Sequence, residues 1–173
     1  SAGLFRPIEA LAIKQTTTPL RVLELACGGG DTAIDLALMA KQRGLALDIH
    51  ACDLNPEAVD IARRNAKARK AEITVFSADA LEKPTDQSSF DVVYCTLFAH
   101  HLDEIEVVRL LEVMALRAQK LVLVDDLIRS RLGFALAWFG TRLLSRSWVV
   151  HTDGPLSVRG ALRPDEMMTI AKK

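Results

Sequence analysis

Acidic and histidine side chains that could bind a ligand or move a proton follow or interrupt several apolar runs of the sequence. They are Glu24, Asp53, Asp79, His100 and His101. A carboxylate inside an apolar run, as at Glu24, is costly unless it finds polar partners. Histidine is the side chain whose ordinary pKa lies nearest neutral pH, which suits it to proton transfer. These residue types predict a polar ligand site with a candidate base in the histidine pair.

Three consecutive glycines, Gly28, Gly29 and Gly30, separate the apolar run at residues 22–26 from a helical pattern that begins at Asp31. Glycine has no Cβ and tolerates positive φ, so such a turn lets the backbone approach a ligand closely. The helix that follows aims its free N–H groups and its positive dipole end at the same place, and Asp31 or Thr32 is expected to cap it. In open α/β sheets ligands bind there, outside the carboxyl ends of the strands. A turn that binds nothing is the alternative.

Apolar runs alternate with amphipathic segments along the chain. We expect strands at residues 21–26, 45–52, 73–76, 90–95 and 121–124. Helices are expected at 4–13, 31–43, from the Asn55-Pro56-Glu57 start, and at 103–118. Strands that alternate with helices at this spacing predict an α/β fold with a mostly parallel, doubly wound sheet and right-handed crossovers. A chain of 173 residues favours one domain, residues 1–173.

Composition excludes several classes of protein. The 22 basic and 22 acidic residues give no net charge, so nothing favours a nucleic-acid partner. No apolar run is long enough to span a membrane, and no signal peptide is evident. The three cysteines, Cys27, Cys52 and Cys95, lack metal-type spacing and fall near expected strand ends. They suit buried, reduced thiols and a cytoplasmic protein. The His100–His101 doublet with Asp103 is not expected to hold a metal.

Two cofactor classes share the glycine turn. Gly28-x-Gly30-x-x-Ala33 satisfies the dinucleotide fingerprint, with Asp53 at the distance that suits a ribose. An NAD-dependent oxidoreductase is therefore one alternative. The sequence lacks the Tyr/Lys pair that is common in such reductases, because Phe98 stands where a lysine would follow Tyr94.

The stretch at residues 22–36 resembles the first motif of class I S-adenosylmethionine-dependent methyltransferases. An acid stands in the strand (Glu24), and small residues alternate in the turn at Ala26, Gly28 and Gly30. The resemblance extends over residues 20–126. It continues through Asp53-Leu54, Asp79-Ala80, Phe90-Asp91-Val92-Val93 and the His-His-Leu segment. The family more often has glycine at the position of Ala26.

This resemblance implies a Rossmann-like sheet of strand order 3-2-1-4-5, with S-adenosyl-L-methionine as cofactor and S-adenosyl-L-homocysteine as product. Asp53 would accept hydrogen bonds from both ribose hydroxyls. Leu54 and Leu81 would contact the adenine faces, Asp79 its amino group, and the Ala80 N–H a ring nitrogen. The methionine part would lie along residues of the turn and the strand tips: Glu24, Ala26, Cys27, Gly28, Gly30, Cys95 and Thr96.

Methyl transfer from a sulfonium needs an aligned nucleophile and, for a hydroxyl acceptor, removal of its proton. His100 and His101 are the candidate bases, and the sequence favours His101. The segment at residues 127–160 would cover the acceptor, because it combines aromatic residues with arginines and a His-x-Asp-Gly-Pro-Leu-Ser-Val stretch similar to that of quinone and polyketide tailoring methyltransferases. Candidate substrate-binding residues are Trp138, Arg142, His151 and Asp153. A core-packing helix and an interfacial helix on a membrane surface are the alternatives for this segment.

The acceptor is expected to be a small, aromatic or apolar molecule, methylated on oxygen in preference to carbon or nitrogen. The family usually has two further strands, which the sequence lacks, so we expect the domain to be incomplete at its C-terminus. A homodimer is one way to cover the exposed sheet edge. A non-catalytic S-adenosylmethionine-binding module is the remaining alternative.

Overall fold

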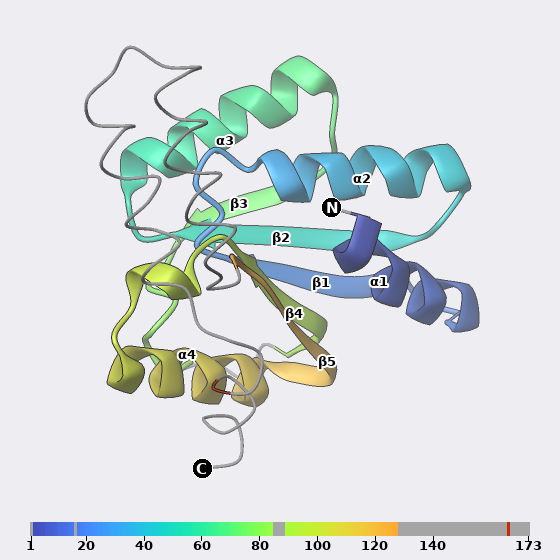
Figure 1. The fold of residues 1–173 in the computed structure, drawn as a ribbon. Helices are drawn as coiled ribbons and strands as arrows, with labels where there is room; N and C mark the ends of the chain where they lie inside the picture. Colours follow the sequence, from blue (N-terminus) through green and yellow to red (C-terminus); the bar gives the residue numbers. More distant parts are fainter. Residues whose placement is uncertain (1, 16, 85–88, 128–165, 167–173) are drawn as a thin grey trace, which may run out of the picture. The chain divides into compact units, whose positions relative to one another are not determined.

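The computed structural model describes residues 2–15, 17–84, 89–127 and 166 (Figure 1). The chain divides into two compact units, of which the first comprises residues 1–96 and 110–125 and the second residues 97–109 and 126–173. The elements follow in the order α1 (Ala2–Lys14), β1 (Leu20–Leu25), α2 (Asp31–Arg43), β2 (Leu47–Asp53), α3 (Pro56–Arg69), β3 (Thr74–Ser77), β4 (Phe90–Thr96), the 3₁₀ turn η1 (Ala99–His101), α4 (Glu104–Arg117) and β5 (Ala118–Asp125).

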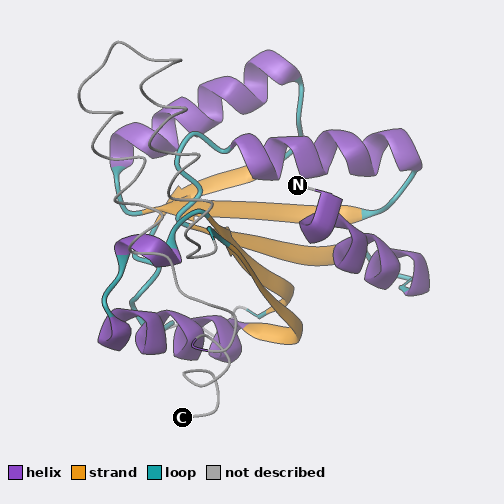
Figure 2. Cartoon of the chain, viewed as in Figure 1, coloured by secondary structure: helices purple, strands orange, loops and turns teal. Residues whose placement is uncertain are grey.

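The five described strands form one sheet in the order β3-β2-β1-β4-β5, and all neighbouring strands are parallel. This confirms the predicted fold class and strand order (Figure 2). Parallel strands need crossover connections, and α2 and α3 provide them between β1, β2 and β3. The carboxyl ends of the strands therefore meet along one edge of the sheet.

The sheet is buried on both faces, which explains why its central strands are almost continuously apolar. One cluster of buried residues joins Val22, Val92 and Tyr94 to residues of α1, α2 and α3. Leu23 and Val93 alternate with these residues along the strands and are also fully buried.

Helix boundaries follow local signals. Asn55 caps α3, because its side chain accepts a hydrogen bond from the Glu57 N–H at 2.9 Å and Pro56 occupies the first helical position. At α4, Asp103 and Glu106 exchange hydrogen bonds of 2.8 and 3.0 Å in a capping-box arrangement. No helix in the described part of the chain carries an apolar stretch long enough to cross a bilayer.

Candidate functional site

The turn between β1 and α2 takes an unusual backbone path. Ala26, Gly28 and Gly30 all have positive φ, at 53°, 52° and 77°. The turn is held by two backbone hydrogen bonds of 2.9 Å, from the Cys27 N–H to the Cys52 carbonyl and from the Gly30 N–H to the Cys27 carbonyl. A Cβ added at Gly28 would meet no atom within 4 Å. The turn therefore presents bare backbone beside open space, as a close-approaching ligand requires.

Helix α2 begins directly from this turn and lacks a side-chain cap. Its N-cap residue, Gly30 in the left-handed conformation, has no side chain to cap the helix, and of the first helical N–H groups that of Ala33 bonds to the Glu24 carboxyl. The expectation that Asp31 or Thr32 caps the helix is wrong, because both already lie in its first turn. An uncapped helix start leaves N–H groups and the positive dipole end available to a ligand.

Helix α3 supports the turn from the side. The Asn65 side chain donates a 3.0 Å hydrogen bond to the Gly29 carbonyl. Ala62 packs so close to Gly30 that a Cβ at position 30 would lie 3.0 Å from the Ala62 Cβ. Neither contact was predicted from the sequence, because neither leaves a local pattern in the chain.

Asp53, at the end of β2, binds the turn through backbone groups. One carboxylate oxygen accepts the Gly28 N–H at 2.8 Å, and the other accepts the Asn55 N–H at 2.9 Å. An ionised carboxylate offers about four acceptor positions, so each oxygen can still accept another donor. The next residue, Leu54, is 64% exposed. This places an apolar side chain beside a carboxylate with spare acceptor capacity.

Asp79 lies beyond β3, next to this carboxylate-bearing strand end. Its carboxylate accepts the Leu81 N–H at 2.8 Å, and the Ala78 N–H bonds to the Asp53 carbonyl at 3.1 Å. The adjoining Ala80 is buried. The loops after β2 and β3 are thereby tied together at the carboxyl edge.

Glu24 is the one fully buried carboxylate in the described part of the chain, and its side chain is held from β4 and α2. Tyr94 donates its hydroxyl to one oxygen at 3.2 Å, and Thr96 donates to the other at 3.0 Å. The Ala33 backbone also bonds to it. Burial raises the pKa of Glu24 to about 7, while the bonds from Thr96, Tyr94 and Ala33 oppose this shift and the charge of Asp31 adds to it.

Cys95 and Thr96, the two residues expected near the transferred methyl group, differ in burial at the end of β4. Thr96 is half-buried, and its hydroxyl lies 3.4 Å from that of Thr32 in the first turn of α2. Cys95 is fully buried, and successive side chains of a strand point to opposite faces. Cys27, Cys52 and Cys95 are all buried and form no disulfide, and burial raises the pKa of Cys27 to about 12 and of Cys52 to about 11. Cys27 and Cys52 therefore stay in the thiol form at neutral pH.

The second unit contains a histidine–aspartate pair. The His100 Nδ1 lies 2.6 Å from one carboxylate oxygen of Asp126, and the His100 backbone N–H donates to the other at 3.0 Å. Both side chains are less than a tenth exposed. His101 is exposed, and its ring centroid lies 4.0 Å from that of His100. Both histidines were predicted as site residues, but Asp126 was not, because its pairing across 26 residues leaves no local signal.

The remaining predicted residues lie outside the described residues: Trp138, Arg142, His151 and Asp153, with all of the 127–160 segment beyond Leu127. Within the described ranges, no group of three or more histidine, cysteine, aspartate or glutamate side chains is arranged to hold a metal ion.

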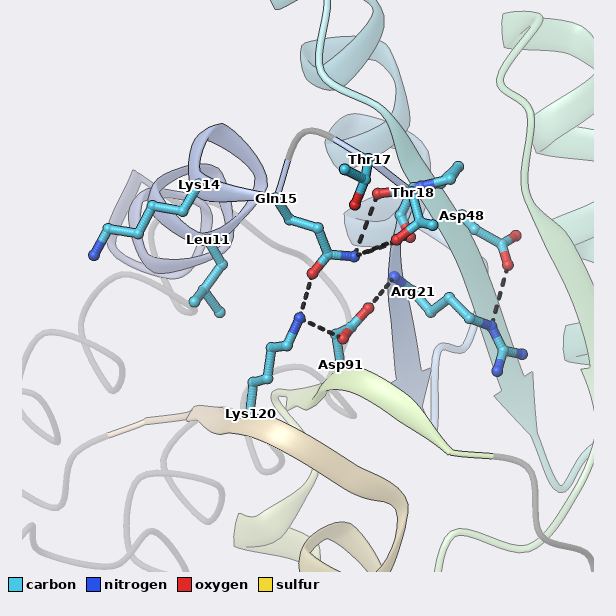
Figure 3. A pocket seen from close by; sticks show the side chains of 10 residues that line it. Leu11, Lys14, Gln15, Thr17, Thr18, Arg21, Asp48, Asp91 and Lys120 are labelled. Atoms are coloured by element: carbon cyan, nitrogen blue, oxygen red, sulfur yellow. Dashed lines mark hydrogen bonds and ion pairs between the residues drawn. The ribbon is translucent and has the colours of Figure 1, made fainter.

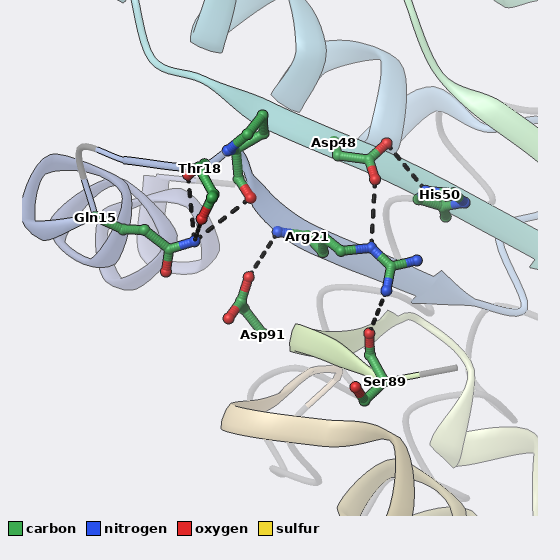
Figure 4. Close-up of polar contacts among 8 residues, drawn as sticks. Gln15, Thr18, Arg21, Asp48, His50, Ser89 and Asp91 are labelled. Atoms are coloured by element: carbon green, nitrogen blue, oxygen red, sulfur yellow. Dashed lines mark hydrogen bonds and ion pairs between the residues drawn. The ribbon is translucent and has the colours of Figure 1, made fainter. Parts of the chain in front are cut away.

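A separate cavity of about 940 Å³ lies at the opposite, amino ends of the strands, between the end of α1 and residues of β1, β2, β4 and β5 (Figure 3). Its charged groups pair with one another. Asp91 accepts the Arg21 N–H and the Lys120 ammonium, both at 2.8 Å, and Lys120 also bonds to Gln15. The Arg21 guanidinium bonds to Asp48 at 3.4 Å and to the Ser89 carbonyl at 2.6 Å (Figure 4). These bonds join the amino ends of β1, β2, β4 and β5.

The Asp91 carboxyl, in the Phe90-Asp91-Val92-Val93 motif, belongs to this amino end. Burial raises its pKa, but the hydrogen bonds from Lys120 and Arg21 and the charge of Lys120 outweigh burial, so the pKa lies below its usual range. The motif therefore has a structural role, joining β4 to β1 and β5.

Comparison with known proteins identifies the family to which the chain belongs. The family model described as a methyltransferase domain matches residues 22–118, more than half of the chain. A demethylmenaquinone methyltransferase of Thermus thermophilus is 43% identical over 75 residues, covering 43% of this chain and 32% of the relative. A 27-O-demethylrifamycin SV methyltransferase of Amycolatopsis mediterranei is 33% identical over 88 residues, which are 49% of this chain and 30% of the relative. The matched stretches span about a third of these relatives.

Solved structures show the same fold. The plantazolicin methyltransferase BpumL, solved with a pentazolic desmethylPZN analogue and SAH, aligns with a TM-score of 0.70 at 19% identity, covering 96% of this chain and 58% of that chain. The glycine turn, the strand order and the family model all indicate the same family. The chain belongs to the methyltransferase domain family, as its resemblance to the class I S-adenosylmethionine-dependent methyltransferases implied.

Proposed function

We propose that the protein transfers a methyl group from S-adenosyl-L-methionine to a hydroxyl of a small aromatic acceptor of the quinol class. The observation that carries the cofactor part is the contact between Asp53 and the glycine turn. One carboxylate bonds to the Gly28 N–H at 2.8 Å and retains acceptor capacity on both oxygens. A ligand with ribose hydroxyls at Asp53 and an amino-acid end at the turn fits this arrangement.

The residues of the carboxyl edge match the parts of that cofactor. Asp53 would bind the ribose hydroxyls, exposed Leu54 would cover an adenine face, and the Asp79-Ala80 pair would bind the adenine edge. The uncapped start of α2 suits the carboxylate of the methionine part. Ala26, Cys27, Gly28 and Gly30 would border that part through their backbone, and Cys95 and Thr96 would lie at the strand tips beside it.

The cofactor supplies an activated methyl group whose leaving group is a neutral thioether, so the protein need only align the acceptor and remove its proton. His100 and His101 are the proposed bases. The geometry favours His100, because a carboxylate at Nδ1 holds the ring in the tautomer whose Nε2 is free to accept a proton. Asp126 would act as its positioning residue.

The acceptor class is inferred from relatives and sequence. The matched relatives are named for demethylmenaquinone and for an oxygen of demethylrifamycin SV. The first name fits a quinone-type acceptor, and the second supports oxygen as the methylated atom. Trp138, Arg142, His151 and Asp153 are proposed to contact the acceptor.

The cofactor assignment is tested by calorimetric titration with S-adenosylmethionine, S-adenosylhomocysteine and NADH. We expect the first two to bind and NADH not to bind. Asp53→Ala is expected to weaken S-adenosylmethionine binding by roughly 1.5–3 kcal/mol, since it removes hydrogen bonds to a charged group. Unchanged affinity would exclude Asp53 from the ribose.

The activity is tested by a methyl-transfer assay on phenols and quinols. His100→Ala is expected to slow turnover and leave cofactor affinity unchanged, with His101→Ala as the matched variant. Cofactor binding without transfer to any hydroxyl acceptor would favour a non-catalytic binding module.

Location and assembly complete the proposal. The three buried cysteines form no disulfide, which fits a reducing compartment, and we propose that the protein is cytoplasmic. β5 is one of the two edge strands of the described sheet, and a homodimer that covers it is checked by light scattering.

A further inference from the structure

Glu24 is a buried carboxylate without a cationic partner among the described residues. It is 1% exposed, and none of the ion pairs in the described part of the chain includes it. An unpaired carboxylate at such a depth is strongly disfavoured in its charged form. The neutral hydroxyls of Tyr94 and Thr96 stabilise the anion without cancelling its charge. Whenever Glu24 is ionised, no positive charge of a described residue therefore compensates its negative charge.

Among the described residues, none of the groups with the largest effects on the Glu24 carboxyl carries a full positive charge. On β4 and in the turn, Tyr94 and Cys27 both have a pKa raised by burial and stay neutral at pH 7. On β2, Cys52 behaves in the same way. On α2, Asp31 is negative and disfavours a second anion. Only the N–H end of α2, through Ala33, offers a positive potential.

A hydrogen-bonded path connects this carboxyl with the edge of the sheet. Thr96 bonds to Glu24 at 3.0 Å, and its oxygen lies 3.4 Å from that of Thr32. Both threonines are half-buried. A hydroxyl can donate and accept at once, so this pair can pass a proton between Glu24 and a ligand or water at the turn.

We infer that Glu24 is a proton-linked counter-charge, which releases its proton to solvent when a ligand with a sulfonium charge binds beside the glycine turn and takes it back when a ligand without that charge replaces it. The inference rests on the proposed function, since S-adenosylmethionine carries a sulfonium charge that S-adenosylhomocysteine lacks. The bond that breaks when S-adenosylmethionine binds is the O–H bond of the Glu24 carboxyl, and this bond re-forms when the sulfonium charge leaves the site. Glu24 would thereby favour the charged donor over the neutral product.

The pH dependence of affinity follows from this exchange. A cation that requires ionised Glu24 loses affinity as pH falls below the pKa of that carboxyl, which burial raises to about 7. The loss approaches about tenfold per pH unit. We therefore expect S-adenosylmethionine affinity to rise up to pH 7 and then level off. The affinity of S-adenosylhomocysteine should change far less.

The test is calorimetric titration at pH 7 in two buffers of different ionisation enthalpy, which reports the protons released on binding. Wild type is expected to release about half a proton more with S-adenosylmethionine than Glu24→Gln does, because a group at its pKa is half protonated. With S-adenosylhomocysteine the two proteins should differ little. Subtracting the variant removes protons that come from the ligand's own amino group.

Two further measurements test the inference independently of the Glu24→Gln variant. Infrared difference spectra of the wild type should lose a protonated-carboxyl band when S-adenosylmethionine is added, which needs no variant. Thr96→Val should move the proton release to higher pH, because it removes a bond that stabilises the anion. If neither ligand binds, the proposed function fails. If S-adenosylmethionine binds, equal proton release in wild type and Glu24→Gln with no change in the carboxyl band overturns the inference alone.

Discussion

Substitution of Gly30 by alanine is expected to destabilise the fold much more than the same substitution at Gly28. Both glycines have positive φ, at 77° and 52°. An L-residue in this conformation costs about 1–2 kcal/mol, so this penalty is common to both variants. The difference lies in the space around each added methyl group, because a Cβ at Gly28 meets nothing within 4 Å, whereas one at Gly30 lies 3.0 Å from the Ala62 Cβ.

The contact at Gly30 lies between the start of α2 and the buried face of α3. Ala62 is fully buried in α3, and its Cα lies 3.5 Å from the same added Cβ. Relief therefore requires a shift of backbone, and overpacking of this kind costs about 1–3 kcal/mol. We expect Gly28→Ala to lower the free energy of unfolding by about 1–2 kcal/mol and Gly30→Ala by about 2–5 kcal/mol.

Urea unfolding followed by circular dichroism measures both free energies. Ala62→Gly in the Gly30→Ala background should recover the contact part, and the double-mutant cycle isolates it from the cost of glycine in a helix. Equal losses for Gly28→Ala and Gly30→Ala, with no coupling to Ala62, would refute the reasoning. S-adenosylmethionine affinity is a separate readout, and Gly28→Ala should impair it because the methyl group would occupy open space beside the turn.

Three other predictions concern stability. Ala26→Gly is expected to raise the free energy of unfolding by up to about 1 kcal/mol, because φ at this position is 53° and glycine adopts it freely. A lower value in urea unfolding would contradict this. The pKa of Glu24 rises from 4.5 to about 7 on folding, so the wild type should lose about 3 kcal/mol of stability as pH rises through this window. Glu24→Gln should abolish that loss, and parallel pH profiles of the two proteins would contradict the assignment. The pKa of Asp91 is lowered on folding, so its contribution is present at neutral pH and lost in acid. Asp91→Asn should cost about 1–3 kcal/mol at pH 7 and little in acid, and an equal loss at both would exclude the contact with Lys120.

The order and direction of the strands were predictable because their signals are local. Short apolar runs separated by amphipathic segments determine a parallel sheet, and Asn55 with Pro56 predicts the start of α3 within one residue. The glycine turn was placed correctly for the same reason. Strand ends differ from the prediction by one to a few residues, most at β5, where the strand begins at Ala118 directly after α4 and no turn residue separates them.

The contacts that organise the site were not predictable from local patterns. Asp53 bonds to a backbone group 25 residues away and Tyr94 to a carboxylate 70 residues away. Such pairs depend on how the strands are juxtaposed. The cap of α2 was predicted wrongly for a related reason. Gly30, in the left-handed conformation, is itself the N-cap residue, so the helix begins earlier than expected and Asp31 lies inside it.

The position of β1 at the centre of the sheet has a consequence for biosynthesis. Val22 pairs with Ile49 on one side and with Val92 on the other, and the second partner emerges from the ribosome much later than the first. Until β4 is translated, one side of β1 has unpaired N–H and C=O groups, and the acid at its middle has neither of its hydroxyl donors. Nascent chains that end before Phe90 should therefore stay protease-sensitive and engage chaperones, and protection should appear only when β4 has left the exit tunnel.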